Sequence, residues 1–259
     1  MDFATVTYTS VGGIARVVLN RPAQLNAISP ALLEDLARVC DAIDADAAVR
    51  VVTLTASGRA FCAGADLKVV RELALDPHRW TAFTRLWHTV FNRIEALPLP
   101  VIAGVHGLAL AGGLELLLVA DLVVTDERAR IGDQHANFGL VAGGGGSQRL
   151  PRLVGARRAK ELMMLGGWLS AAEAREWGLV NRVVEAGTVA AAVEEMAVTL
   201  AAKSRSANAT LKRLLHTAEG DLATGLEREI NLVAGHMRTK DAAEGLAAFA
   251  AKRAPTFTD

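Results

Sequence analysis

The first half of the chain alternates short β-branched stretches with stretches of helical spacing. Residues 14–20 (IARVVLN) are apolar and β-branched, and an Arg-Pro pair follows them, which is typical of a strand that ends in a turn. Residues 29–46 then repeat apolar side chains every three or four positions, with Ser29 at the N-cap position and Pro30 in the first turn. This order predicts a strand followed by a helix.

Further rounds of strand and helix follow. The same patterns predict strands at 49–56, 101–107 and 121–126 and helices near 78–96 and 112–120. Strands that are joined through helices need crossover connections, so we expect a largely parallel sheet buried between helices. The fold class predicted for this part of the chain is α/β.

From about Ser147 the pattern becomes helical, with little strand between the helices. Helical spacing recurs at 159–166, 170–178, 189–204, 209–219 and 241–253. We therefore divide the chain into an α/β core, residues 1–190, and a helical C-terminal region, residues 191–259. We expect the C-terminal helices to pack on the core or on another subunit.

The charge and hydropathy of the chain narrow the classes of protein. Its 259 residues include 28 basic and 28 acidic side chains, and this balance argues against nucleic acid or a membrane surface as a partner. The longest apolar run, 101–124, is interrupted by glycines, a histidine and two acidic residues, so it fits buried strands and a helix better than a membrane span. Only two cysteines occur, and the N-terminus lacks the features of a signal peptide, which favours a cytoplasmic protein.

Two glycine-containing loops follow successive predicted strands, at 58–66 (GRAFCAGAD) and 107–116 (GLALAGGLEL). Gly112 lies near the start of the predicted helix, where unpaired N–H groups and the helix dipole favour a developing negative charge. Two such amides that meet at one point would form an oxyanion hole, although glycine-rich turns also occur for packing alone. Glu115 follows three residues later in an apolar run, so it is either a proton-transfer group or one half of a structural ion pair.

A third glycine-rich stretch, residues 130–150, carries further candidate chemistry. Asp133 and His135 are candidate proton-transfer groups, in which Asp133 either orients His135 or serves as a solvated cap. The run Gly143–Gly146 could form a phosphate-binding loop, a hinge or the start of a helix. The histidines and cysteines show no metal-ligand spacing, so we expect no metal, and the tryptophans, Trp87 among them, are interpreted as core or interface residues.

Several segments together resemble the crotonase superfamily, or enoyl-CoA hydratase/isomerase family, over nearly the whole chain. The segments are 19–28, 58–67, 102–116, 143–155, 174–184 and 244–257. The resemblance implies a crotonase-like spiral of ββα units with a helical C-terminal region that mediates trimerisation and closes the CoA pocket. It also implies an acyl-CoA thioester substrate, a homotrimer or a dimer of trimers, and no separate cofactor, because coenzyme A is carried by the substrate.

The resemblance assigns roles to individual positions of this sequence. Ala65 and Gly112 correspond to the two backbone donors of the oxyanion hole, so Cys62 in the same loop is expected to be a packed side chain and not a nucleophile. The other matches concern an adenine-binding surface, two positions that approach the CoA phosphates and a C-terminal pair that reaches the CoA of a neighbouring subunit. They are, in that order, Leu25 and Ala63, Arg59 and Lys68, and Phe249 and Lys252. For the basic residues a solvated surface charge is the alternative.

The sequence departs from the family pattern at one candidate catalytic position. Glu115 corresponds to the first of two glutamates that hydratases of this family use, and His135 stands where the second would be. A neutral imidazole with a pKa near ~6.5 can still orient water or transfer a proton at neutral pH. We therefore expect a hydratase that adds water to a 2-enoyl-CoA, or removes it, with Glu115 and His135 as the acid/base pair. The alternatives are an isomerase, a decarboxylase or a thioester hydrolase that uses Glu115 alone, and, third, a non-catalytic acyl-CoA-binding protein.

Overall fold

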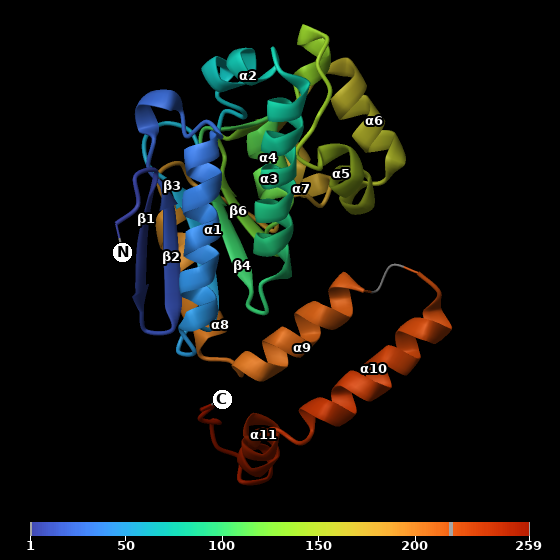
Figure 1. Ribbon diagram of the computed structural model, residues 1–259. Helices are drawn as coiled ribbons and strands as arrows, with labels where there is room; N and C mark the ends of the chain where they lie inside the picture. Colours follow the sequence, from blue (N-terminus) through green and yellow to red (C-terminus); the bar gives the residue numbers. More distant parts are fainter. Residues whose placement is uncertain (1, 218–219, 259) are drawn as a thin grey trace.

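The computed structural model describes residues 2–217 and 220–258 (Figure 1). Within these ranges the main sheet has six strands in the order β1-β2-β3-β4-β6-β9. β1 and β2 form an antiparallel hairpin, and every later pair of neighbours is parallel. The strands are β1 (Val6–Val11), β2 (Ile14–Leu19), β3 (Val51–Ala56), β4 (Val101–Val105), β6 (Leu122–Asp126) and β9 (Arg182–Val184).

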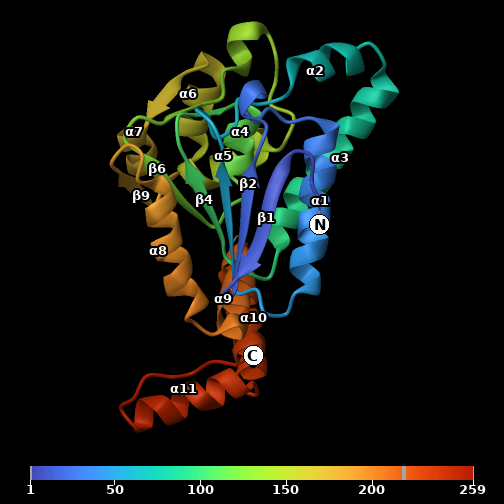
Figure 2. The same ribbon diagram turned by 90° about the vertical axis from the view of Figure 1, so that its left-hand side faces the viewer.

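Helices cover both faces of this sheet, which explains why its central strands are largely apolar. α1 (Pro30–Ala45) and α3 (Pro77–Ala96) pack on one face and α8 (Val189–Ala201) packs on the other (Figures 1 and 2). Every residue of β4 is buried, as expected for a parallel strand between two helical layers. The face under α8 has an apolar cluster of its own, in which Val193 lies with Ile102.

A smaller sheet and several short helices complete the core. In this sheet β5 pairs in parallel with β7, and β7 pairs antiparallel with β8. The elements are β5 (Leu108–Leu110), β7 (Arg130–Gly132), β8 (Trp168–Ser170), the 3₁₀ turns η1 (Pro22–Gln24) and η2 (His135–Phe138), and the helices α2 (Leu67–Leu73), α4 (Gly112–Leu117), α5 (Gly146–Val154), α6 (Ala156–Leu165) and α7 (Ala171–Glu176).

The last three helices extend away from the core as an arm. They are α9 (Arg205–His216), α10 (Leu222–His236) and α11 (Lys240–Ala250), and they lie below the sheet in Figure 1. The division expected at residue 190 falls on the second residue of α8. Because α8 packs on the sheet, the helices that stand apart from the core begin only at α9. None of the helices in the described ranges is both long and apolar enough to cross a membrane.

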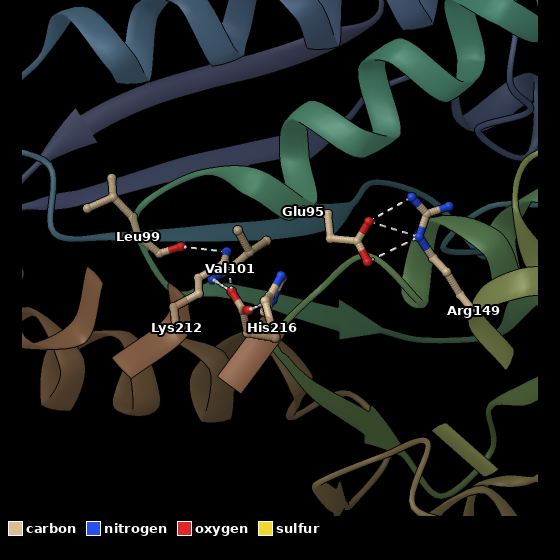
Figure 3. A network of polar contacts seen from close by, with 7 residues as sticks. Glu95, Leu99, Val101, Arg149, Lys212 and His216 are labelled. Atoms are coloured by element: carbon tan, nitrogen blue, oxygen red, sulfur yellow. Dashed lines mark hydrogen bonds and ion pairs between the residues drawn. The ribbon is translucent and has the colours of Figure 1, made fainter. Parts of the chain in front are cut away.

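A buried polar network attaches the arm to the core through α9 (Figure 3). The ammonium of Lys212 donates to Oδ2 of Asp121 at 2.7 Å and to the carbonyl of Leu99 at 3.0 Å. Asp121 also accepts the N–H of Val101 at 2.8 Å, and Nε2 of His216 lies 3.3 Å from its other oxygen. Burial lowers the pKa of Lys212, and the charge of Asp121 opposes that effect. The second half of α9 is therefore fixed to the strand that begins at Val101.

The structure confirms the strands predicted at 14–20, 49–56, 101–107 and 121–126 and the helices between them. The sequence patterns do not predict β1, in which only Val6 is buried, or the three-residue strands β5, β7, β8 and β9, which are too short to show a period. They also do not predict α10, a helix with no buried residue. The α/β class with a helical C-terminal part is confirmed, and the little strand expected after Ser147 consists of β8 and β9.

Candidate active site

Two loops that follow β3 and β4 lie against each other and bring Ala65 close to Gly112. A Cβ placed on Gly64 would lie only 3.3 Å from the nitrogen of Gly112. A Cβ placed on Gly113 would overlap with the carbonyl oxygen of Cys62. Only glycine fits at position 113, because the backbones of the two loops are in direct contact there.

The N–H group of Ala65 has no acceptor in residues 2–217 and 220–258. Ala65 forms a β-bridge with Ile28, but both hydrogen bonds of that bridge use the neighbours of Ala65. The N–H of Ile28 donates to the carbonyl of Gly64 at 2.7 Å, and the N–H of Asp66 donates to the carbonyl of Ile28 at 2.8 Å. The amide of Ala65 is thus free to bind an oxygen atom of a ligand.

The N–H group of Gly112 is free for a different reason. Gly112 is the first residue of α4, where a helical N–H has no partner within the helix. The residue before it, Ala111, has φ 51° and ψ −112°, a combination that residues other than glycine rarely adopt. The N–H of Ala111 donates to the carbonyl of Gly132 at 2.9 Å, and this bond helps to hold the strained turn. Backbone strain of this kind is concentrated at functional sites.

Glu115 is buried on α4, with only 1% of its surface exposed. Its Oε1 accepts the N–H groups of Gly144 at 2.7 Å and Gly146 at 2.9 Å. Burial raises the pKa of Glu115, and the two N–H groups, followed by the charge of His135, oppose that rise without cancelling it. No Lys or Arg of the described chain forms an ion pair with Glu115. The alternative of a structural ion pair is therefore wrong, and the partners of this carboxylate are backbone amides.

His135 is held by Asp133, the residue that the sequence places two positions before it. Nδ1 of His135 lies 3.0 Å from Oδ1 of Asp133, and its backbone N–H donates to the same oxygen at 3.2 Å. Burial by itself lowers the pKa of His135, but the hydrogen bond and charge of Asp133 and the charge of Glu115 outweigh it, so the pKa is raised. With Nδ1 facing Asp133, the nitrogen left for a ligand is Nε2.

The glycine run begins a helix and supplies amides to a carboxylate. α5 starts at Gly146, and Gly145 before it has φ 111°, in the left-handed region that favours glycine. The side chain of Arg149 connects this turn to α3, since it donates to the carbonyl of Gly144 at 3.4 Å and pairs with Glu95 of α3 at 2.7 Å (Figure 3). Of the three readings left open for the run, the start of a helix is confirmed.

The residues matched to CoA binding fall into two groups in the single chain. Leu25 and Ala63 are joined by a hydrogen bond of 3.0 Å from the N–H of Ala63 to the carbonyl of Leu25, next to the oxyanion loop. Arg59 and Lys68 are exposed near the same loop. Phe249, 87% exposed, lies at the end of α11 and Lys252 follows this helix, at the opposite end of the molecule from α2 and α4 (Figures 1 and 2). One chain therefore does not bring this last pair to the candidate site.

The structure adds Trp87 to the site, which the sequence indicated only as a core or interface residue. Trp87 belongs to a row of aromatic rings on α3, with ring centroids 5.6 Å from Phe83 and 5.7 Å from Phe91. Its indole reaches past this row, because a Cβ placed on Gly112 or on Gly144 would collide with it. The helical spacing of the aromatic residues predicted their burial but not the direction of this ring.

Two other expectations concern Cys62 and metal binding. Cys62 is fully buried, and burial raises the pKa of its thiol to about 12, as expected for a packed side chain. Among the described residues, no group of three or more His, Cys, Asp or Glu side chains could hold a metal ion.

Two free amides beside a buried carboxylate and a histidine–aspartate pair define an enzyme site suited to proton transfer next to an oxyanion. The chain belongs to the enoyl-CoA hydratase/isomerase family, whose model matches residues 9–259. It is 35% identical over 259 residues to "Probable enoyl-CoA hydratase echA8" of Mycobacterium leprae (strain TN), covering 100% of this chain and 99% of that protein. It is also 35% identical over 251 residues to "1,2-epoxyphenylacetyl-CoA isomerase" of Escherichia coli (strain K12), covering 95% of each.

A solved structure agrees with these sequence matches. The crystal structure of an enoyl-CoA hydratase from Bacillus anthracis superposes with a TM-score of 0.93 at 37% identity, covering 98% of this chain and 99% of that one. The resemblance drawn from the sequence is confirmed, and so is the crotonase-like α/β fold. The protein is an enzyme of the enoyl-CoA hydratase/isomerase type. The third alternative, a non-catalytic acyl-CoA-binding protein, is therefore not supported.

Proposed function

We propose that this enzyme adds water to a 2-enoyl-CoA, and removes it in the reverse direction, with Glu115 and His135 as its acid/base pair. One observation carries the proposal. The carboxylate of Glu115 is held by two amides beside Gly112, and its charge and that of His135 affect each other's pKa. Two coupled titratable groups next to a pair of free amides are what hydration of a polarised double bond requires.

The free amides of Ala65 and Gly112 would bind the thioester oxygen. As water adds at Cβ, the negative charge moves onto this oxygen, and the two N–H groups stabilise the enolate. Removal of one donor of this kind typically costs about 3–4 kcal/mol of transition-state stabilisation.

The remaining steps move two protons. Glu115 takes a proton from the water whose oxygen forms the bond to Cβ, which its raised pKa favours. His135, protonated and oriented by Asp133, gives the proton at Nε2 to Cα. Glu115 then returns a proton to His135, so the net reaction adds one molecule of water to the double bond.

The CoA portion of the substrate would lie along the loop that contains Ala63 and Leu25. Exposed Arg59 and Lys68 offer positive charge for its phosphates. Phe249 and Lys252 would reach it from a neighbouring subunit. No separate cofactor is needed in this reaction, because coenzyme A arrives with the substrate.

A homotrimer or a dimer of trimers would supply that neighbour. The arm exposes a set of large apolar side chains, which in a monomer would face water. They are Leu211, Leu215, Leu222, Leu226, Ile230, Val233, Met237, Leu246 and Phe249.

The balanced net charge supports a small-molecule substrate over nucleic acid. Two buried, unpaired cysteines suit the reducing cytoplasm that we propose as its location.

The second candidate function is an isomerase, decarboxylase or thioester hydrolase that uses Glu115 alone. Two observations favour it: His135 stands at the place of the second glutamate, and one relative is named as an isomerase.

Mass spectrometry separates these reactions when purified enzyme is incubated with a panel of short, branched and aromatic CoA thioesters. Hydration adds the mass of water, isomerisation leaves the mass unchanged, and decarboxylation removes carbon dioxide. If no 2-enoyl-CoA in the panel gains water, the hydratase proposal fails.

A further inference from the structure

An unpaired hydrogen-bond donor lies inside the candidate active site. Trp87 is 5% exposed, and its Nε1 is buried without a partner in the described part of the chain. A buried N–H without an acceptor is destabilising, so such groups in folded proteins usually meet water or a ligand.

Nε1 of Trp87 lies near the oxygen of Glu115 that accepts no hydrogen bond from the described residues. Glu115 accepts its two amides through Oε1, and no residue in 2–217 or 220–258 donates to Oε2. A Cβ placed on Gly144 would lie 2.5 Å from Oε2 and 2.6 Å from Nε1 of Trp87. A donor and an acceptor thus pack against the same side of Gly144, yet they are not hydrogen-bonded to each other. One oxygen atom that accepts from Nε1 and donates to Oε2 would satisfy both.

The same ring also packs against the Cα of Gly112, the residue whose N–H is proposed for the oxyanion hole. A Cβ placed on Gly112 would lie 2.6 Å from Cζ2 of Trp87, the atom next to the N–H edge of the indole. The edge of the ring therefore extends from Gly112, where the thioester carbonyl would bind, to Gly144 beside the carboxylate.

We infer that the indole N–H of Trp87 holds the reacting oxygen of the hydration, together with Oε2 of Glu115. This inference rests on the proposed hydratase function. The N–H donates to the oxygen while Glu115 takes one of its protons, which leaves a lone pair to form the bond to Cβ. In the reverse direction the same N–H stabilises the hydroxide that leaves Cβ. No bond of the indole is made or broken.

Removing this N–H while keeping the ring gives a direct test. Trp87→Phe retains an aromatic side chain in the row with Phe83 and Phe91. Because a hydrogen bond to a group with developing charge is lost, kcat for hydration should fall by about 10- to 100-fold with little change in KM. Exchange of the Cα hydrogen of a saturated acyl-CoA with deuterium needs only the oxyanion amides and His135. The variant should therefore exchange this hydrogen at a rate within about twofold of the wild-type rate. Trp80→Phe, on the same helix, is the matched control and should change neither rate.

A second measurement does not depend on that variant. In protein labelled with ¹⁵N-tryptophan, binding of a 3-hydroxyacyl-CoA should move one buried indole N–H resonance downfield. The saturated acyl-CoA of the same chain length, which lacks the Cβ oxygen, should not. An absent shift would overturn the inference even if Trp87→Phe failed to fold.

The other outcomes separate the two proposals. A Trp87→Phe enzyme that hydrates at the wild-type rate overturns the role of Trp87 alone, and so does an equal loss of hydration and exchange, which indicates packing. A wild-type enzyme that exchanges the Cα hydrogen but never adds water overturns the hydratase proposal, and the role of Trp87 with it.

Discussion

A carboxylate inside an apolar core is stable only when its charge is solvated by the protein, and Glu115 meets this condition through backbone amides. The N–H groups of Gly144 and Gly146 donate to one of its oxygens, and a Cβ at position 144 would collide with the carboxylate, while one at position 146 would crowd it. Because amides carry no net charge, they hold the group without the strong pKa depression that an arginine would cause. Burial therefore dominates, and the raised pKa favours proton uptake.

We expect Glu115→Gln to lower the hydration rate by about 10²- to 10⁴-fold, the usual contribution of a general acid or base. The amide side chain is close in size, so binding of acyl-CoA should persist. Steady-state kinetics together with acyl-CoA binding by calorimetry checks both points. Glu34→Gln, at an exposed position of α1, is the control and should leave the rate unchanged. A Glu115→Gln enzyme of full activity would contradict the mechanism.

The Asp133–His135 contact predicts a change in pH dependence. Asp133 raises the pKa of His135, and it also adds to the rise in the pKa of Glu115. In the proposed mechanism the active form has Glu115 ionised and His135 protonated, so activity falls below the first pKa and above the second. Asp133→Asn removes the charge, and both limbs of the kcat/KM profile of the coupled pair should move to lower pH. An alkaline limb that stays in place would show that Asp133 does not govern His135.

At the level of elements, the strands β2, β3, β4 and β6 were predictable because they are runs of largely buried and mostly β-branched side chains, whereas β1 buries only Val6. The three-residue strands were not predictable, because their pairing is imposed by neighbours far away in the sequence, as when β7 lies between β5 and β8. The candidate site likewise contains residues that the sequence predicted and one feature that it did not. Gly112 and Glu115 lie just after a predicted strand, and the sequence placed them correctly on a helix. The orientation of the Trp87 ring depends on how α3 packs against two loops. A local sequence pattern carries no information about this packing.

The attachment of α9 makes a prediction about stability. Lys212 is 9% exposed and shares Asp121 with the N–H of Val101. Lys212→Met removes the cation and leaves a largely buried carboxylate without its main partner, which should cost roughly 3 kcal/mol of unfolding free energy. Urea unfolding of the two proteins measures the difference, and the exposed Lys203→Met is the control. A loss no larger than that of the control would mean that the network contributes little to holding the arm.

At the scale of the whole molecule, the arm is the part that a single chain leaves incomplete. α10 has no buried residue, although apolar side chains recur along it at helical spacing. Such a helix is expected to bury one face against another chain. The core, in contrast, buries its apolar residues under α1, α3 and α8 without help from the arm.

We expect the double variant Leu226→Glu, Ile230→Glu to dissociate the assembly. Charges on this face of α10 would be buried without partners in a trimer, which strongly disfavours association. Light scattering should show a wild-type particle of several chains and a variant close to the 27.3 kDa of one chain. Activity should fall with it, because Phe249 and Lys252 of a neighbour would no longer reach the CoA. Glu229→Gln on the same helix is the control, and a dissociated variant of full activity would contradict the shared site.

The position of α11, at the far end of its own chain from α4, also has a genetic consequence (Figure 1). In the proposed assembly each site takes Glu115 from one chain and Lys252 from another. A chain altered at Glu115 and a chain altered at Lys252 would then build some complete sites when they assemble together. Two inactive alleles of this gene should therefore complement each other when one lesion is at Glu115 and the other at Lys252, and should fail to do so when both lie in α4.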